Sequence, residues 1–332
     1  MKNKHVYAPI PYFGGKRSVV DVVWRAFGDP KHYIEPFFGG GAILLGRPGG
    51  AGKHETVGDL NHHVANFWRA VKHAPDEVAK HADNPISEID LFAWNNLIVQ
   101  DEDFHTQMAT NPRYYNAEYA GRWAWGMSSC IGMDFGKHVY KQRMQPKTNN
   151  ETGLHMARNY SITSMKAQLT CNVGTQSMST NIYDWINKLA QRLCCVNVIC
   201  SSWETTIRDA IVLDRSHRIT PCAVFLDPPY DGSLRSKACY ATDEHGMSAK
   251  VREWALAYGD YPRIRIALCG YEGEHTMPDS WRVHKWSAQG GMSNYGKHRN
   301  DNKHKERIWF SPHCIHDPDI FDAIGSNTKE DE

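Results

Sequence analysis

Short apolar runs alternate with helix-like segments in two stretches of the chain, 33–72 and 182–310. The apolar runs predict buried strands at 33–36, 56–59, 196–200, 223–226, 264–268, 281–286 and 307–310. Helices are predicted between them, at 42–45, 61–72, 182–193 and 247–257. Strands that alternate with helices in this way predict a doubly wound α/β sheet.

The interval from 75 to 181 has a different pattern. A helix-like segment at 87–99 gives way to turn-rich sequence with few long apolar runs, and aromatic residues cluster between 94 and 125, which favours a small aromatic core. We therefore expect a mainly helical insert that interrupts the sheet after its second strand. Positive charge gathers in the insert and again in the loop 290–306, which indicates a surface for nucleic-acid phosphates. The basic residues that carry this prediction are Lys137, Lys141, Arg143, Lys297 and Arg299.

Composition limits the classes of function. The net charge is only +1, so affinity for nucleic acid must come from local patches. No apolar stretch is long enough for a membrane span and the N-terminus has no signal-peptide pattern, so we expect a cytoplasmic protein without a membrane partner. The nine cysteines form no C-x-x-C pair, which fits reduced thiols. The histidines have no metal-ligand spacing; we expect no metal, and we interpret His62-His63 as a pair on a helix surface.

The segment 224–230, Val-Phe-Leu-Asp-Pro-Pro-Tyr, carries the clearest chemical signal. Two consecutive prolines have no N–H to donate, so the predicted strand must end there and its last groups face a cleft. The Asp227 carboxylate and the Pro228 carbonyl are two acceptors for the two hydrogens of an amino group, and Tyr230 adds an aromatic face. This arrangement predicts a site for a planar base that bears an exocyclic amino group.

A glycine-rich turn follows the first predicted strand. Phe37-Phe38-Gly39-Gly40-Gly41 precedes a helix, and glycines at such a turn let the backbone approach a ligand closely. Asp59 ends the next strand about twenty residues later, an offset that suits the ribose hydroxyls of a nucleotide-type cofactor. The stretch 47–54 lacks the first glycine and the Ser or Thr of a phosphate-binding loop, so we predict only a flexible loop there.

The segments 11–16 (Pro-Tyr-Phe-Gly-Gly-Lys), 35–41 and 227–230 occur in an order that resembles the Dam-type DNA adenine N6-methyltransferases. The resemblance covers about 1–72 and 182–312. It implies a Rossmann-like methyltransferase domain made of 1–74 and 182–322 and a target-recognition insert at 75–181. It also implies S-adenosylmethionine as the cofactor and double-stranded DNA with a flipped adenine as the substrate, with no obligatory protein partner. The polar composition of the end of the chain predicts a disordered tail at 323–332.

The resemblance also implies roles for individual residues. Asp227, Pro228 and Tyr230 would hold the target adenine, with Asp227 close to the cofactor as well. The residues implied to bind S-adenosylmethionine are Tyr12, Lys16, Phe38, Gly39, Gly41, Asp59, Trp203 and Asp227. The sequence departs from the family at Ser202-Trp203, where an Asp-aromatic pair is common, so the aromatic ring is kept and the carboxylate is missing.

These groups predict direct, in-line methyl transfer to an adenine amino group without a metal or a covalent intermediate. RNA is an alternative acceptor. Cytosine N4 and protein glutamine are two further acceptors. Enzymes that methylate cytosine N4 often resemble carriers of an S-P-P-Y motif, and those that methylate glutamine resemble carriers of an N-P-P-Y motif. Asp227 at the first position of the motif therefore argues for adenine. A DNA-binding protein on an inactive methyltransferase scaffold is the non-enzyme alternative, and Ser202 is its support.

Overall fold

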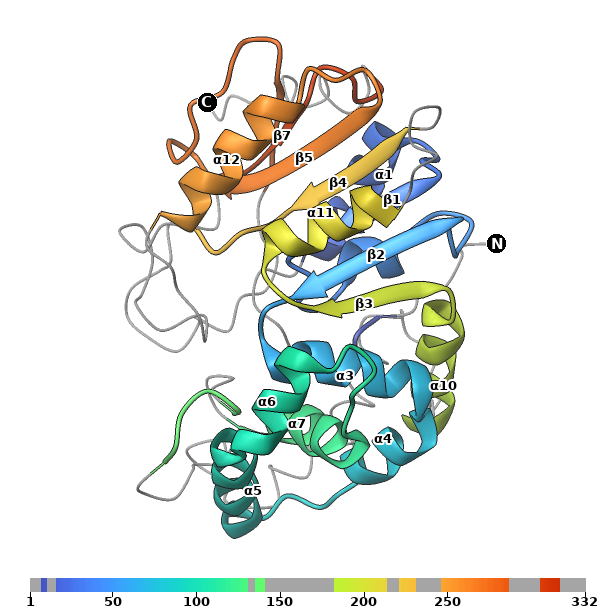
Figure 1. Ribbon diagram of the computed structural model, residues 1–332, viewed down its shortest axis with the longest axis vertical. Coiled ribbons are helices and arrows are strands. Elements are labelled where there is room, and N and C mark those ends of the chain that lie inside the picture. The colour runs from blue at the N-terminus through green and yellow to red at the C-terminus, as the bar shows by residue number, and fades with distance from the viewer. Residues whose placement is uncertain are drawn as a thin grey trace, which may run out of the picture. The chain divides into compact units, whose positions relative to one another are not determined.

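The computed structural model describes residues 7–10, 16–130, 135–140, 182–213, 221–230, 246–286 and 305–316, without the side chains of 209–213. Its strands are β1 (His32–Glu35), β2 (His54–Asp59), β3 (Val196–Cys200), β4 (Cys222–Leu226), β5 (Ile264–Tyr271), β6 (Arg282–Lys285) and β7 (Glu306–Phe310). The first helices are the 3-10 turn η1 (Lys16–Val19), α1 (Val20–Phe27), α2 (Ala42–Leu45), α3 (His62–His73), α4 (Pro75–Ala82) and α5 (Glu88–Gln100). The later helices are α6 (Glu102–Thr110), α7 (Ala117–Ser129), α10 (Ile182–Leu193), α11 (Trp203–Leu213) and α12 (Met247–Tyr258) (Figure 1).

The described strands form a seven-stranded sheet in the order β3-β2-β1-β4-β5-β7-β6. β1 runs parallel to β2 and to β4, and β4 runs parallel to β5. β7 is antiparallel to both of its neighbours, β5 and β6. This sheet confirms the predicted α/β class. The chain moves outward from β1 and later returns to place β4 on its other side, so the β1–β4 boundary is a topological switch point, where open α/β sheets bind ligands.

The fold divides into two compact units, described separately here. The first contains the described parts of Met1–Phe13, Gly39–Gly41 and Gly58–Ser202; the second contains those of Gly14–Phe38, Ala42–Val57 and Trp203–Glu332. The sequence predicts a different, functional division, in which 75–181 is the insert. The helices α4 to α7 fall within that interval, but most of 130–181 lies outside the described residues, so a helical inserted domain stays a prediction.

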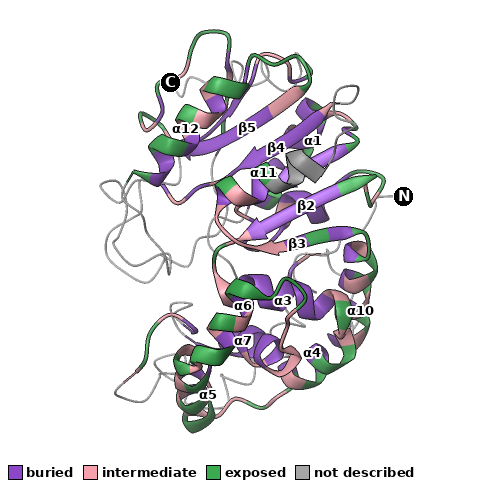
Figure 2. Ribbon diagram, in the orientation of Figure 1, coloured by how far each residue is buried: buried purple, intermediate pink, exposed green. Residues whose placement is uncertain are grey.

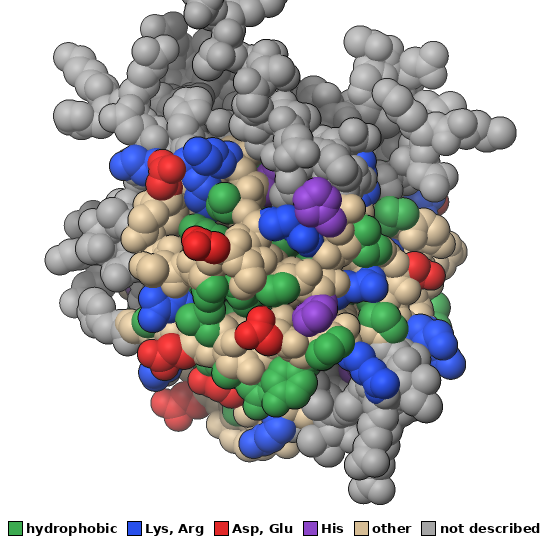
Figure 3. Space-filling view, turned by 90° about the horizontal axis from the view of Figure 1, so that it is seen from above, with side chains coloured by type: hydrophobic (Ala, Val, Ile, Leu, Met, Phe, Trp, Pro, Cys, Tyr) green, Lys and Arg blue, Asp and Glu red, His purple; other side chains and the backbone are tan. Residues whose placement is uncertain are grey.

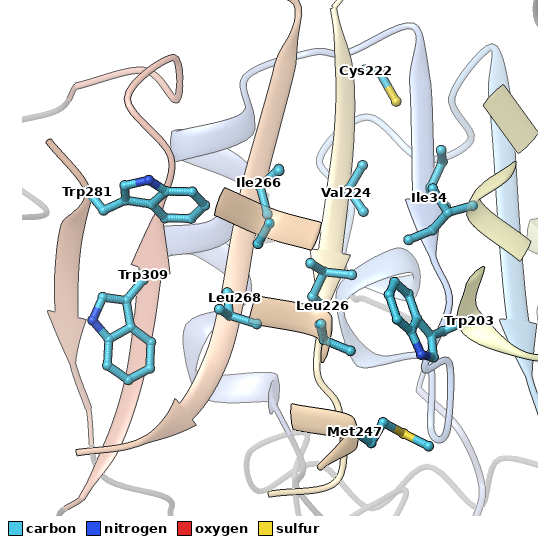
Figure 4. Packing of buried hydrophobic residues seen from close by; sticks show 13 residues of the cluster. Ile34, Trp203, Cys222, Val224, Leu226, Met247, Ile266, Leu268, Trp281 and Trp309 are labelled. Carbon is cyan, nitrogen blue, oxygen red and sulfur yellow. The ribbon is translucent and has the colours of Figure 1, made fainter. Parts of the chain in front are cut away.

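The core of the second unit lies on one face of its strands. Ile34, Val224, Leu226, Ile266 and Leu268 point to the same side of β1, β4 and β5, where they pack with residues of α11 and α12 (Figure 4). Because side chains alternate along a strand, Tyr33 faces the opposite side, where its ring lies 4.9 Å from that of Trp24 in α1. β4 is buried along its whole length (Figure 2), which explains its unbroken apolar sequence.

The first unit is built from capped helices. Asn61 caps α3 by accepting from the backbone N–H of His63 at 2.9 Å, and Asp101 and Asn116 cap α6 and α7 in the same manner. Val64, Phe67, Trp68 and Val71 are all buried, which confirms the predicted apolar face of α3.

Two local predictions are wrong. His63 is 5% exposed and its ring stacks on Phe104, so His62-His63 is not a surface pair; α6 covers that face of α3. The stretch 47–54 is also not simply a flexible loop, because its first residue, Arg47, is anchored in the fold. The Arg47 guanidinium is buried, donates to Glu55 at 3.0 Å and to the Pro30 carbonyl at 2.8 Å, and thereby compensates the buried Glu55 carboxylate.

Candidate active site

The Asp-Pro-Pro-Tyr segment leaves the carboxyl end of β4 at the switch point. Leu226, the last residue of β4, is buried, whereas the Asp227 side chain is 18% exposed. The two prolines that follow cannot continue the strand ladder, so the chain turns away from the sheet immediately after the carboxylate. Asp227 therefore lies at the edge of a rigid, buried strand.

A buried ammonium group contacts the end of this strand. Lys16, the first residue of η1, is 4% exposed. Its Nζ lies 2.9 Å from Oδ2 of Asp227 and donates to the Tyr230 hydroxyl at 3.0 Å. The Tyr230 hydroxyl in turn donates to Oε2 of Glu306 at 2.8 Å. Asp227, Lys16, Tyr230 and Glu306 thus form one continuous hydrogen-bonded network, and all four belong to the second unit.

The charges of this network determine its protonation. Burial lowers the pKa of Lys16, but the negative charge of Asp227 and that of Glu306 outweigh it and raise the pKa well above its ordinary value. Burial also raises the pKa of Glu306, against the effect of Lys16, and raises that of Tyr230. Lys16 therefore stays protonated, and Tyr230 stays a neutral hydrogen-bond donor.

Tyr230 is held more tightly than its motif alone indicates. The side chain is 8% exposed, and its ring packs edge-on against Tyr271 with the ring centroids 4.6 Å apart. With its hydroxyl bound at both sides, the ring has a fixed orientation. Such a ring can offer a wall to a bound base without first being ordered.

Asp59 and the glycine turn meet in the first unit. Oδ2 of Asp59 accepts from the Gly39 backbone N–H at 2.9 Å, and Oδ1 accepts from that of Asn61 at 2.9 Å. Gly39 and Gly41 both have positive φ, at 46° and 63°, so this turn favours glycine. Burial raises the pKa of Asp59 to about 6, and the two backbone N–H groups only partly oppose the shift. Each carboxylate oxygen retains a second lone pair for a further donor.

Two other predicted cofactor residues are buried. Phe38 is 3% exposed, and Trp203, the first residue of α11, is 7% exposed within the core cluster. The Trp203 ring stacks on that of Phe37 with the centroids 6.4 Å apart. The contact of Phe38 and Trp203 with a cofactor stays a prediction. Tyr12 lies outside the described residues.

Lys137 is the one predicted DNA-binding residue that the structure describes; Lys141, Arg143, Lys297 and Arg299 lie outside the described residues. Lys137 is half-buried in a segment that α5 holds in place. Asn95 accepts from the Gly136 N–H and donates to the His138 carbonyl, both at 2.7 Å. On the face in Figure 3, the described basic and acidic side chains are interspersed.

A model of the D12 class N6 adenine-specific DNA methyltransferases matches residues 12–256, which is well over half of the chain. The chain belongs to this family. It is therefore an adenine-specific DNA methyltransferase, in agreement with the resemblance on which the sequence prediction rested. A comparison with curated proteins gives no match.

In this methyltransferase, sequence reasoning missed Glu306 and Glu35. Glu306 begins β7, and its only signal is a carboxylate at the start of a strand that is buried throughout. Glu35 is 3% exposed, and its Oε2 accepts from the Tyr33 hydroxyl at 2.8 Å and from the Leu44 N–H at 3.3 Å. Glu35 thus links β1 to α2 across the glycine turn.

Among the described residues of the methyltransferase, no group of three or more His, Cys, Asp or Glu side chains could hold a metal ion. None of the helices in that part of the chain is long and apolar enough to cross a membrane.

Replacing Lys16 with methionine should lower the free energy of unfolding by about 3–5 kcal/mol at pH 8, because Asp227 and Glu306 lose their buried counter-charge. Without the ammonium, which opposes the effect of burial, the folded-state pKa of Glu306 rises further above its unfolded value. The stability that raised carboxyl pKa values confer is present at low pH and lost as the pH rises, so the deficit should shrink at pH 5. Urea unfolding of the wild type and of Lys16→Met at pH 8 and pH 5 measures this difference in the free energy of unfolding.

The matched control is Lys80→Met, which removes an exposed ammonium 3.1 Å from Glu77. That change should cost no more than about 1 kcal/mol. A Lys16→Met deficit that is equal at pH 8 and pH 5 would show that lost packing, and not uncompensated charge, is responsible.

Proposed function

We propose that this methyltransferase moves a methyl group from S-adenosylmethionine directly to N6 of an adenine that is flipped out of double-stranded DNA. The observation that carries the proposal is the Asp227 carboxylate, which stands at the end of β4 at the switch point and is paired with the buried Lys16. The family supports adenine in DNA as the substrate. The cofactor, the flipping and the residue roles below are parts of the proposal.

Asp227 and Pro228 would activate the amino group. The lone pair of an adenine amino group is delocalised into the ring and is a weak nucleophile. Two acceptors, the Asp227 carboxylate and the Pro228 carbonyl, would draw the two N–H bonds toward tetrahedral geometry and localise the lone pair. The carboxylate would also offset the positive charge that develops on nitrogen, which stabilises the transition state electrostatically. In-line positioning of nitrogen against the methyl carbon can lower the barrier by roughly 7–11 kcal/mol.

Tyr230 would stack on the flipped adenine. Flipping costs a few kcal/mol, and stacking on an aromatic ring returns about 1–3 kcal/mol of that. The bonds from the Tyr230 hydroxyl to Lys16 and Glu306 support this role, since they hold the ring in one orientation before the base arrives.

The cofactor would be bound by groups that follow β1 and β2. Asp59 would accept the ribose hydroxyls with its remaining lone pairs, and the turn at Gly39 and Gly41 would wrap the cofactor backbone. Lys16 and Tyr12 would lie near its methionine part. Phe38 would belong to the same loop around the cofactor backbone, and Trp203 would supply an aromatic ring near the cofactor adenine. The chemistry of S-adenosylmethionine itself, an electrophilic methyl group on a sulfonium, requires no metal.

The experiment that tests the proposal incubates the protein with labelled S-adenosylmethionine and duplex DNA, and then maps modified adenines by sequencing. A parallel incubation with RNA of the same sequence tests the other acceptor. Label in DNA adenine N6 supports the proposal. Cofactor binding without label in either nucleic acid would instead favour the inactive scaffold.

Asp227→Ala should reduce turnover by about a hundredfold or more, because the transition state loses its negative partner. Single-turnover methylation with saturating DNA and cofactor measures the change. The control is Asp279→Ala, an exposed carboxylate in the turn before β6, which should leave turnover unchanged. A folded Asp227→Ala protein that keeps more than about a tenth of wild-type turnover would remove Asp227 from the mechanism.

Cofactor affinity should fall as the pH drops through about 6, the pKa of Asp59, because the ionised carboxylate is the better acceptor for hydroxyls. The loss between pH 7 and pH 5 should be about tenfold. The folding stability of the free protein depends on pH in the opposite direction. Because the pKa of Asp59 is raised in the folded state, its contribution to stability is present at low pH and lost as the pH rises through about 6. Calorimetry with S-adenosylmethionine checks the affinity, and Asp59→Asn should bind weakly at all pH values. A wild-type affinity that does not vary with pH contradicts the assignment.

Neutralising Lys141 and Arg143 should weaken DNA binding and flatten its salt dependence. Each lost phosphate contact should reduce the log–log slope by about one. Affinity for S-adenosylmethionine should not change. DNA titrations at several salt concentrations measure the slope, with Lys297 and Arg299 replaced in a second variant. If only the second variant changes the slope, the DNA surface lies in the 290–306 loop and not in the insert.

A further inference from the structure

Glu306 belongs to the buried network but lies outside the Asp-Pro-Pro-Tyr motif and outside the residues 12–256 that the family model covers. It is 7% exposed at the first position of β7. Its backbone is held from both sides, since it faces Tyr271 in the β5–β7 pair and its carbonyl accepts from the Trp286 N–H at 3.3 Å. The sheet therefore places this carboxylate rigidly beside the candidate active site.

The direction of each hydrogen bond in the network is determined by Lys16. An ammonium group can only donate, so the Tyr230 oxygen must accept from it. The Tyr230 proton must then go to another acceptor, and Oε2 of Glu306 receives it at 2.8 Å. Glu306 is thus the accepting end of a chain of donors that starts at Lys16.

The other end of the network is Asp227. Lys16 lies 2.9 Å from Oδ2 of Asp227, so Oδ1 would be the oxygen that accepts from the adenine amino group in the proposed reaction. If Tyr230 lost its acceptor, its buried hydroxyl would have to turn, and the Lys16 ammonium would lose a fixed partner. The ammonium could then move across the Asp227 carboxylate and compete with the amino group for it.

We propose that Glu306 is a positioning residue for methyl transfer: by accepting the Tyr230 proton it fixes Lys16, and through Lys16 it fixes the Asp227 carboxylate. This inference rests on the role proposed for Asp227. In this role Glu306 would act through Tyr230 and Lys16 and not by contact with the base or the cofactor.

The test compares Glu306→Ala, Glu306→Gln, Tyr230→Phe and the two double variants by single-turnover methylation. Glu306→Ala should lower kcat by about 10- to 100-fold, the effect of leaving a buried donor unpaired, with little change in KM for DNA. Glu306→Gln keeps an acceptor oxygen and should restore most of the rate. Tyr230→Phe should lower kcat, and in its background the Glu306 substitutions should have almost no further effect.

The matched control is Glu272→Gln. Glu272 follows β5, is 57% exposed and pairs with Arg307, so this change removes a nearby carboxylate without touching Lys16 or Tyr230. It should leave kcat unchanged. A loss in Glu272→Gln as large as the loss in Glu306→Ala would mean that general charge, and not the Tyr230 contact, is responsible, and would overturn the inference.

Wild-type kcat in Glu306→Ala, or losses that multiply in the double variants, would overturn the inference too. If Glu306→Ala does not fold, Tyr230→Phe alone decides, since wild-type turnover in that variant removes the proposed link. An active Asp227→Ala protein would defeat the proposed function itself. Loss of activity in Asp227→Ala together with full activity in Tyr230→Phe would defeat only the inference about Glu306.

Discussion

The Lys16–Asp227 ion pair is the constraint on which the active-site end of the sheet depends. A buried ammonium is costly unless charged and hydrogen-bonding partners surround it. Lys16 obtains its partners from segments far away in sequence; Tyr230, for example, is 214 positions away. The segment before α1, the end of β4 and the start of β7 must therefore come together in one geometry. Apolar packing alone would not select that geometry, because it does not require a particular donor to meet a particular acceptor.

The sheet supplies the rigid frame for this pair. Parallel pairing of β1 with β4 places the turn after each strand at the same switch point, and the core residues of these strands hold both in register. The prolines after Asp227 prevent the strand from continuing beyond the carboxylate. Antiparallel pairing of β7 with β5 then brings Glu306 opposite Tyr271, whose ring packs against Tyr230. Asp227 directly follows one buried strand and Glu306 begins another, and such rigid elements hold the groups of a site in place.

Two aspartates that end strands have different environments, and the roles proposed for them differ accordingly. Asp227 has a cation in contact, so its negative charge is compensated before any substrate binds. Asp59 is bound by backbone N–H groups, and burial raises its pKa to about 6. A carboxylate of this second kind is poorly compensated in the free protein and gains most from new donors. This fits the ribose hydroxyls proposed for it, whereas the paired Asp227 suits a partner that becomes positive during the reaction.

Much of the fold could be predicted from the sequence, because strand and helix periodicity are local properties of the chain. The apolar run before Asp227, the face of α3 and the order of the motifs all follow from neighbouring residues, and they led to the correct α/β class and family. The pattern could not reveal that His63 is buried beneath α6, that Arg47 compensates Glu55, or that Tyr230 is held by Glu306. Each of these depends on which side chain from a distant segment arrives at the same place. A sequence shows that a charge or ring is present, but only the tertiary structure decides whether water or another buried group satisfies it.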